Sequence, residues 1–240
     1  MGPPDTWNRM ADWLRSIPGS LPETPRALLV ISGHWEAPAP TVTTSANPSL
    51  IYDYGGFPPH TYELKWPAPG APELAGRVQS LVSGARADAT RGFDHGVFIP
   101  LKVAFPEAAI PTVQLSLVAG LDPAQHLAIG RALAPLRDEG VLIIGSGMSY
   151  HNMQGFYRPR SLDKSEAFDH WLGETVAAAP AERDERLSRW AEAPFAHECH
   201  PREEHLIPLM VAAGAGGEDP GAQVFRDQVM GVWVSAAKFG

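Results

Sequence analysis

The sequence predicts one α/β domain with a mainly parallel or mixed central sheet flanked by helices. Two apolar runs of strand length, residues 27–32 and 141–144, show no alternation of polar and apolar side chains. Such runs are typical of strands that are buried on both faces. Segments with helical periodicity lie between the expected strands. No internal repeat, linker or low-complexity tract interrupts the 240 residues, so residues 1–240 are treated as a single domain.

Local features justify each expected element. Asp5 or Thr6 is expected to cap a first helix, in which Trp7, Met10 and Trp13 recur at helical spacing. Prolines in or just before a first turn mark later helix starts, and Gly140 marks an end. After that helix, the sequence predicts a strand at 27–32, an irregular Pro/Gly/aromatic loop at 45–70 and helices at 72–82 and 96–105. A strand at 112–117, a helix at 123–138 and a strand at 141–144 are expected next. The chain is then expected to form one or two helices within 161–193, a helix at 203–213, and closing strands at 224–225 and 229–235.

Composition excludes several classes of partner. The net charge is −8 and the basic residues are not clustered, so neither nucleic acid nor an anionic membrane surface is an expected partner. The longest apolar runs are strand-sized, which predicts no membrane span. The single cysteine, Cys199, excludes an internal disulfide and favours a reducing, cytoplasmic location. The 24 prolines, 23 glycines and 9 histidines predict many sharp turns and raise the question of a metal site.

Four histidines fall where α/β proteins bind ligands, at or near the carboxyl ends of strands and at helix starts. His34 follows the strand at 27–32, His151 follows the strand at 141–144, His95 lies in a glycine-flanked turn before a helix, and His205 is expected in the first turn of a helix. Glycines beside His34 and His95 let the backbone approach a ligand or adopt unusual torsions. For four other histidines an ordinary surface or packing role is expected, with His60, in the aromatic loop, as the partial exception; the four are His60, His126, His170 and His197.

The residues alone leave the chemistry of these histidines open. Imidazole binds Fe(II), Zn and Cu, and mononuclear oxygenases often use two histidines and a carboxylate. The sequence has no H-E-x-x-H motif and no cysteine pair, which excludes a zincin and a cysteine-based structural zinc. Ser146 lacks the five-residue nucleophile-elbow pattern, and the glycines around it do not form a dinucleotide fingerprint. Cys199 stands beside Glu198, which disfavours a reactive thiolate.

Several short motifs occur in an order that resembles a known family. They are Ser32-Gly-His34-Trp-Glu36, Tyr54-Gly-Gly-Phe57-Pro58, Trp66-Pro-Ala-Pro-Gly70, Phe93-Asp-His95-Gly96, Ser146-Gly147 with His151-Asn152, and His200-Pro-Arg-Glu-Glu-His205-Leu-Ile-Pro-Leu209. This pattern resembles the class III, or LigB-type, extradiol ring-cleavage dioxygenases, and within them the DOPA 4,5-dioxygenase-like branch. The resemblance runs from about residue 5 to the end of the chain.

The resemblance implies a non-haem metal, Fe(II) in ring-cleaving members and Zn(II) as the second candidate. By position, His34, His151 and His205 match histidines of the metal site, and His95 matches a histidine that lines the substrate pocket. His151 also matches the acid–base histidine of better-studied members, so the resemblance leaves it as ligand or base. Glu204 is an alternative donor, because related branches use a carboxylate near this position.

The resemblance also implies a strand ahead of this chain. Relatives begin with a strand that ends in a His-Gly turn, and that histidine is a metal ligand. The expectation is therefore an N-terminally truncated domain that binds metal poorly and turns over slowly. An unpaired sheet edge would favour self-association into a homo-oligomer.

The expected reaction is extradiol cleavage of a catechol-type ring by O2, with His151 and His95 as the catalytic histidines. Aromatic residues of the loop at 45–70 are expected either to wall the pocket or to pack in the core; they are Tyr54, Phe57, Tyr62 and Trp66. Two alternatives remain open at this point. One is a non-catalytic, Memo-like binding protein on the same fold, and the other is a zinc hydrolase with His34 and His205 as ligands and Glu204 as base.

Overall fold

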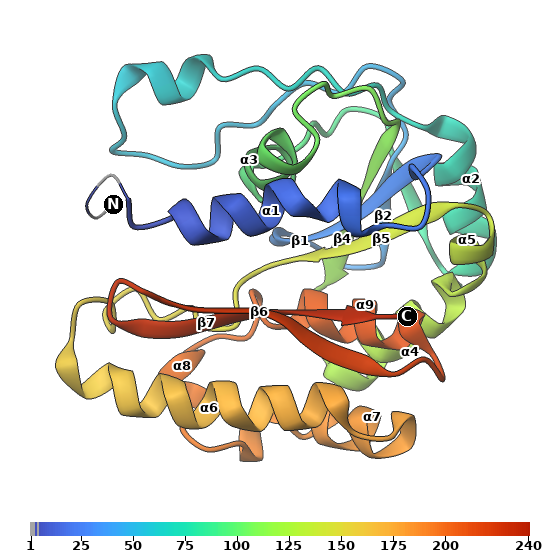
Figure 1. Cartoon of the computed structure of the whole chain (residues 1–240). Coiled ribbons are helices and arrows are strands. Elements are labelled where there is room, and N and C mark those ends of the chain that lie inside the picture. Colours follow the sequence, from blue (N-terminus) through green and yellow to red (C-terminus); the bar gives the residue numbers. More distant parts are fainter. Residues whose placement is uncertain (1–2, 4) are drawn as a thin grey trace.

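The computed structural model describes residue 3 and residues 5–240 (Figure 1). Its centre is a five-stranded sheet in the order β3-β2-β4-β1-β5. Strand β1 pairs in parallel with β4 and β5, whereas β2 runs antiparallel to β4. The predicted α/β class with a mixed sheet is therefore confirmed. The strands are β1 (Ala27–Ala37), β2 (Thr41–Thr43), β3 (Arg86–Asp88), β4 (Thr112–Val118) and β5 (Val141–Ser146).

The central strand β1 explains why its apolar run has no alternation. Leu28 and Val30 pack in a cluster on one face of the sheet, and Leu29 and Ile31 pack in a different cluster on the other face. Both faces are thus covered, as parallel sheets require. The strand is longer than expected and continues to Ala37, so that the first candidate histidine lies within the strand and not after it.

Helices cover both faces of the sheet, and a further layer lies outside one of them (Figure 1). Helices α1 (Asn8–Ser20) and α3 (His95–Ala104) lie on one face with the aromatic loop. Helices α2 (Pro72–Leu81), α4 (Pro123–Leu133) and α9 (Ile207–Gly216) lie on the other. The remaining helices are α5 (Pro135–Asp138), α6 (Pro159–Ala177), α7 (Pro180–Ser188) and α8 (Ala196–Cys199), with short 3-10 turns at Pro59–Glu63 and Trp190–Glu192.

The two closing strands are longer than expected and do not join the central sheet. Strands β6 (Gly221–Val229) and β7 (Val232–Phe239) pair with each other as a separate antiparallel hairpin. Met230 and Gly231, both at positive φ, form the tight turn between them. The hairpin packs on α6, which places it in the outer layer.

Three predicted helix boundaries are wrong, each for a local reason. The helix expected at 123–138 is broken at Pro135, which lacks the N–H that would continue the helix. The helix expected at 203–213 begins only at Ile207, so His205 lies in the turn before α9. The first helix is capped by neither Asp5 nor Thr6, because Trp7 is the capping residue and no side chain bonds the helix end. Among the described residues, no helix has the length and apolar character that crossing a membrane requires.

Helices α4 and α9 approach each other closely because each carries a glycine at the contact. A Cβ atom on Gly130 would lie 2.2 Å from the Val211 carbonyl oxygen, and one on Gly214 would lie 2.2 Å from the Leu127 carbonyl oxygen. Backbone therefore packs on backbone at this crossing. Since α9 follows directly on the turn that holds His205, this contact fixes one side of the candidate site.

Replacing Gly130 with Ala is expected to destabilise the protein by about 2 kcal/mol or more, because the added methyl overpacks rigid backbone. Gly76→Ala is the matched control. Gly76 lies in α2 with open space around its Cα, so alanine there should stabilise by about 0.5–1 kcal/mol. Urea unfolding of both variants measures the difference. Equal stability of the two would contradict the close helix contact.

Candidate metal centre and its surroundings

The four candidate histidines lie together at the carboxyl ends of β1 and β5. The Nε2 atoms of His34 and His205 are 3.2 Å apart. The His95 ring lies 3.9 Å from the His34 ring, and the His151 ring stacks 3.4 Å from the His205 ring, measured between ring centroids. These residues come from a strand, a helix start and two loops, and the parallel sheet gathers them as expected.

The spacing between His34 and His205 is that of two ligands on one metal ion. Metal–nitrogen bonds of about 2.1 Å that meet at roughly 90–110° hold their two nitrogens about 3.0–3.4 Å apart. The observed 3.2 Å between the two Nε2 atoms falls in that range. Without a metal, one of these nitrogens must carry a proton and donate it to the other. A cation placed between them would accept both lone pairs instead.

Glu204 sets the orientation of two of the rings. Its Oε1 accepts a hydrogen bond from Nδ1 of His205 at 2.9 Å and lies 3.3 Å from Nδ1 of His151. A proton held on Nδ1 of His205 leaves its Nε2 as a lone pair that faces His34. Glu204 itself lies against Arg202, which also binds Glu36 on β1.

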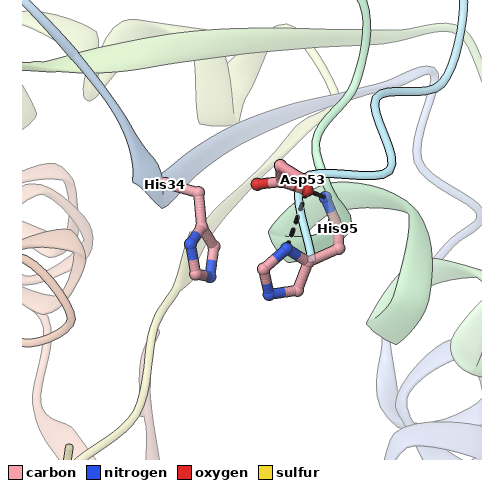
Figure 2. Close-up of side chains that lie close together, drawn as sticks. All are labelled: His34, Asp53 and His95. Carbon is pink, nitrogen blue, oxygen red and sulfur yellow. Dashed lines mark hydrogen bonds and ion pairs between the residues drawn. The ribbon is translucent and has the colours of Figure 1, made fainter. Parts of the chain in front are cut away.

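His95 is held by a carboxylate that the sequence did not reveal. Asp53 Oδ1 accepts the backbone N–H of His95 at 2.9 Å and lies 2.8 Å from its ring Nδ1 (Figure 2). This leaves the His95 Nε2 free on the side of the metal centre. Burial alone would raise the pKa of Asp53, but the hydrogen bonds from His95 outweigh it and lower that pKa. Asp53 is therefore a carboxylate at neutral pH and accepts a hydrogen bond from Nδ1 of His95.

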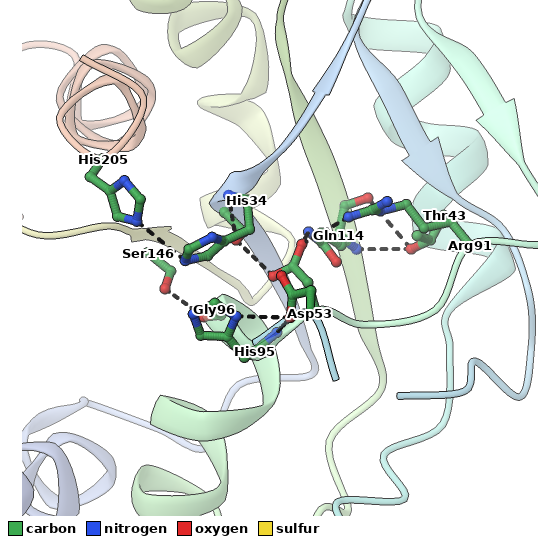
Figure 3. Close-up of polar contacts among 11 residues, drawn as sticks. His34, Thr43, Asp53, Arg91, His95, Gly96, Gln114, Ser146 and His205 are labelled. Atoms are coloured by element: carbon green, nitrogen blue, oxygen red, sulfur yellow. Dashed lines mark hydrogen bonds and ion pairs between the residues drawn. The ribbon is translucent and has the colours of Figure 1, made fainter. Parts of the chain in front are cut away.

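A buried polar network supports the site from beneath (Figure 3). Asp94 is fully buried at the N-cap of α3, where its carboxylate binds the Ser32 hydroxyl at 2.8 Å, the Arg91 guanidinium at 3.1 Å and the Gln114 amide. The Ser32 hydroxyl also accepts the backbone N–H of His34 at 3.2 Å. The network therefore ties the start of α3 to β1 and β4 at the point where the histidines emerge.

The glycines beside His34 and His95 serve close contacts within the protein. A Cβ on Gly33 would lie 2.8 Å from the Glu204 carbonyl oxygen, and one on Gly96 would lie 2.3 Å from the Ser32 hydroxyl and 2.9 Å from the His34 ring. Neither glycine has a positive φ. The expected unusual torsions are therefore absent at these two residues, and the glycines instead let the turn at Glu204 and helix α3 pack against β1.

Burial favours the neutral form of three of these imidazoles, His34, His151 and His205. Burial, with the neighbouring His151 and His34 rings, lowers the pKa of His205 to about 2. Burial also lowers the pKa of His34, and the nearby His95 lowers it further. The pKa of His151 is lowered by burial although Glu204 opposes the change. Neutral imidazole is the form that binds metal or accepts a proton, so the cluster is ready for either role at pH 7.

Two groups of side chains bring donor atoms within 4.8 Å of one another among the described residues. One is His34, Asp53 and His95, and the other is His151, Glu204 and His205. The predicted ligand His34 belongs to the first group and His205 to the second, and their Nε2 atoms face each other. The third predicted ligand, His151, lies beside Glu204 instead, and its role as ligand or base stays a prediction.

The aromatic loop divides into core and site residues. Tyr54 packs edge-on against His95 at 5.5 Å between centroids, and Phe57 and Tyr62 pack around Tyr54. Trp66 instead is buried against Phe93, and its Nε1 donates to the Phe105 carbonyl. Trp66 therefore packs in the core, whereas the role of Tyr54, Phe57 and Tyr62 as walls of a substrate pocket stays a prediction.

The remaining histidines and Cys199 do not join the cluster. The buried His126 accepts the Val118 N–H and bonds the Asp122 carbonyl, His197 packs on Trp190, and His60 and His170 are exposed. Burial and the neighbouring Glu198 raise the pKa of the Cys199 thiol to about 12, so no thiolate forms at neutral pH. The ordinary roles expected for these residues agree with their positions.

Imidazoles and carboxylates gathered at the carboxyl edge of an α/β sheet are the kind of groups that a mononuclear non-haem metal site uses. Residues 4–236 match the model of the catalytic LigB subunit of aromatic ring-opening dioxygenases. A "4,5-DOPA dioxygenase extradiol" of Beta vulgaris is 42% identical, with 85% of this chain and 78% of the relative covered. The enzyme of that name from Portulaca grandiflora is 40% identical over 90% and 81%. The crystal structure of an uncharacterized protein from Escherichia coli K12 covers 95% of this chain and 90% of its own, with a TM-score of 0.78 and 28% identity.

The chain belongs to the LigB family of aromatic ring-opening dioxygenases, in the branch of the DOPA dioxygenase-like extradiol enzymes. It is an extradiol ring-cleaving dioxygenase, and the family implies a metal cofactor. The donor spacing and the neutral imidazoles fit that requirement. The further ligand and the preceding strand that the resemblance implies stay predictions.

Asp53→Ala is expected to lower kcat for ring cleavage by about 10- to 100-fold, because the His95 ring loses the acceptor that fixes its tautomer and orientation. Asp53→Asn keeps a carbonyl acceptor and should recover part of the loss. Steady-state kinetics with iron content measured on the same samples test this. Unchanged kcat in the alanine variant, or a loss explained entirely by missing iron, would contradict the positioning role.

The buried His200 predicts a pH-dependent stability. Burial lowers the pKa of His200 from 6.5 to about 4. Above pH 6.5 the imidazole is neutral in both folded and unfolded chains, whereas below it the unfolded chain takes up a proton first. The free energy of unfolding should therefore fall by up to about 3 kcal/mol between pH 6.5 and pH 4 through this group. His200→Gln should flatten the dependence, and His170→Gln, an exposed control, should not; denaturant unfolding at several pH values decides.

Proposed function

We propose that this dioxygenase cleaves the ring of a DOPA-like catechol next to its diol, with Fe(II) as the metal and Zn(II) as a non-productive competitor. The single observation that carries the proposal is the pair of facing Nε2 atoms of His34 and His205. The family relation supports the reaction class, and the printed names of relatives support the choice of catechol.

His34 and His205 would hold the metal through their Nε2 atoms. When bound, the metal supplies a positive charge that lowers the pKa of the catechol hydroxyls and brings the diol and dioxygen to one place. Glu204 keeps His205 in the tautomer that presents a lone pair. Two protein ligands hold a metal weakly, so we expect the protein to need an excess of Fe(II) for full occupancy.

His151 is the proposed acid–base residue. Its ring is partly exposed and lies over His205, so a substrate bound at the metal would meet it. Glu204 beside its Nδ1 favours a proton on that nitrogen and leaves Nε2 to take the second catechol proton. The same imidazolium would later return the proton to the opening ring.

His95 would contact the substrate or dioxygen through Nε2. Because Asp53 accepts the Nδ1 proton, Nε2 acts as an acceptor unless the ring is doubly protonated. It therefore binds the hydrogen of a hydroxyl better than it donates to an oxygen. Tyr54 and Phe57 lie beside His95 and would contact the ring and side chain of the catechol.

The two alternative functions have weaker support. A zinc hydrolase is disfavoured by the family relation, because the chain matches aromatic ring-opening dioxygenases over nearly its whole length. A Memo-like binding protein would not need two neutral histidines at metal-ligand spacing. A cytoplasmic location is part of the proposal, supported by the single, buried cysteine.

Protein loaded anaerobically with Fe(II) and then given DOPA and oxygen is expected to form a ring-opened yellow product, with one O2 consumed per product. His34→Ala and His205→Ala should each lower the rate at least about 100-fold, because the remaining imidazole cannot retain the metal. His170→Ala, on the exposed face of α6, should behave as the parent protein.

Three results would contradict the proposal. Product formation without added metal, full activity of the two histidine variants, or equal turnover in the absence of oxygen would each exclude the proposed site. Persistence of a hydrolytic activity with Zn(II) alone would favour the hydrolase in its place.

A further inference from the structure

One backbone carbonyl at the start of α3 lacks the partner that a regular helix would give it. In an α-helix the carbonyl oxygen of Gly96 would accept the N–H of the residue four positions later. That residue is Pro100, which lies inside α3 and has no N–H to donate. Gly96 is buried, and a buried carbonyl without a hydrogen-bond partner is unfavourable. The sequence of α3 therefore leaves an acceptor, next to His95, that must be satisfied from outside the helix.

Ser146, the last residue of β5, supplies the missing donor. Its hydroxyl donates to the carbonyl oxygen of Gly96, with 2.5 Å between the two oxygens (Figure 3). The bond joins the end of a strand to the first turn of a helix that lies far away in the sequence. Because β5 is paired in register with β1, the sheet fixes the position of this hydroxyl.

Ser146 has a counterpart on the neighbouring strand. Ser32 of β1 is its register partner, and the Ser32 hydroxyl donates to the Asp94 carboxylate at 2.8 Å. The two serines thus hold the residues directly before and directly after His95, which are Asp94 and Gly96. The carboxyl ends of two paired strands therefore set the position of the first turn of α3.

The position of this turn decides where the His95 ring lies. The ring is 3.9 Å from that of His34, between centroids, and His34 is itself fixed within β1. Asp53 bonds the ring Nδ1 and so sets the rotation of the ring, but Asp53 belongs to the irregular loop and not to the sheet. A shift of about 1 Å in a group that contacts the substrate can slow a reaction on the order of 100-fold. An anchor on the backbone beside His95 therefore matters for the rate.

We propose that Ser146 is a positioning residue for ring cleavage, because its bond to the carbonyl that Pro100 leaves free holds His95 in place beside the metal centre. The inference rests on the proposed function, in which His95 contacts the substrate or dioxygen. Ser146 acts through the backbone of Gly96 and not by contact with the substrate. Pro100 is the second half of the arrangement, since the proline creates the unpaired acceptor that the serine satisfies.

The test removes the serine hydroxyl with and without the proline. Ser146→Ala in the Fe(II)-loaded protein is expected to lower kcat about tenfold and to change KM for DOPA less than about twofold, since the groups proposed to hold the metal are unchanged. Ser146→Thr keeps a hydroxyl and should recover most of the rate. In a Pro100→Ala background the alanine N–H can bond Gly96, so adding Ser146→Ala should cost less than about twofold. Iron content is measured on every sample.

Amide hydrogen exchange of the metal-free protein gives a readout that does not depend on activity. In Ser146→Ala the amides of residues 95–98 should exchange at least about fivefold faster than in the parent, whereas those of α4 should not change. Pro100→Ala should reverse the effect. Ser188→Ala is the matched control, because it removes another partly buried hydroxyl that donates to a backbone carbonyl, that of Asp184 in α7. It should change neither kcat nor the exchange of residues 95–98.

A loss of kcat and a faster exchange that Pro100→Ala both relieves support the proposal. An equal loss of kcat in the two backgrounds would overturn it, because the serine would then act by packing or by contact with the substrate. A Ser146→Ala variant that leaves either kcat or the exchange unchanged would overturn it as well. If the Fe(II)-loaded parent cleaves no catechol, the proposed function itself fails, and the exchange alone then decides whether Ser146 holds the turn at His95. Faster exchange that Pro100→Ala relieves would support that role, and equal exchange would overturn it.

Discussion

The burial of β1 between β4 and β5 is the constraint on which the rest of the molecule depends. Parallel hydrogen bonding on both edges and apolar packing on both faces leave this strand one position and one direction. Its carboxyl end therefore delivers His34 to a fixed point. The start of α3 and the turn at Glu204 then pack against that point through Gly96 and Gly33. Replacing Gly33 or Gly96 with a residue that carries a side chain would push apart histidines that come from distant parts of the chain.

The surroundings of the site favour the neutral form of His34, His151 and His205. Asp53 accepts a hydrogen bond from Nδ1 of His95, and Glu204 accepts one from Nδ1 of His205, while Asp94 is paired with Arg91 and with polar hydrogens. Acidic groups thus lie behind the imidazoles and leave the Nε2 side without a fixed negative charge. Such an arrangement strengthens the nitrogens as ligands without competing for the metal itself.

Much of the fold could be predicted from the sequence, because it follows from local patterns. The strand at 27–32 depends on a continuous apolar run, and the start of the helix near 72–81 depends on Pro72 in its first turn, and both signals are local. Asp53 could not be found in this way. It lies in an irregular loop 42 residues before its partner His95, and only the tertiary structure brings the two together. The sequence predicts His205 in the first turn of a helix that begins at residue 203, whereas Pro208 lies in the first turn of a helix that begins only at Ile207.

The lack of any buried residue in α1 has a consequence for motion. Its apolar side chains, among them Trp13 stacked on Phe225, are only partly covered, so detaching this helix should cost less free energy than global unfolding and would leave the central sheet intact. The rate at which any large molecule enters beneath α1 would then be set by the opening of this one helix, and the tightly packed contact of α4 with α9 would play no part in it.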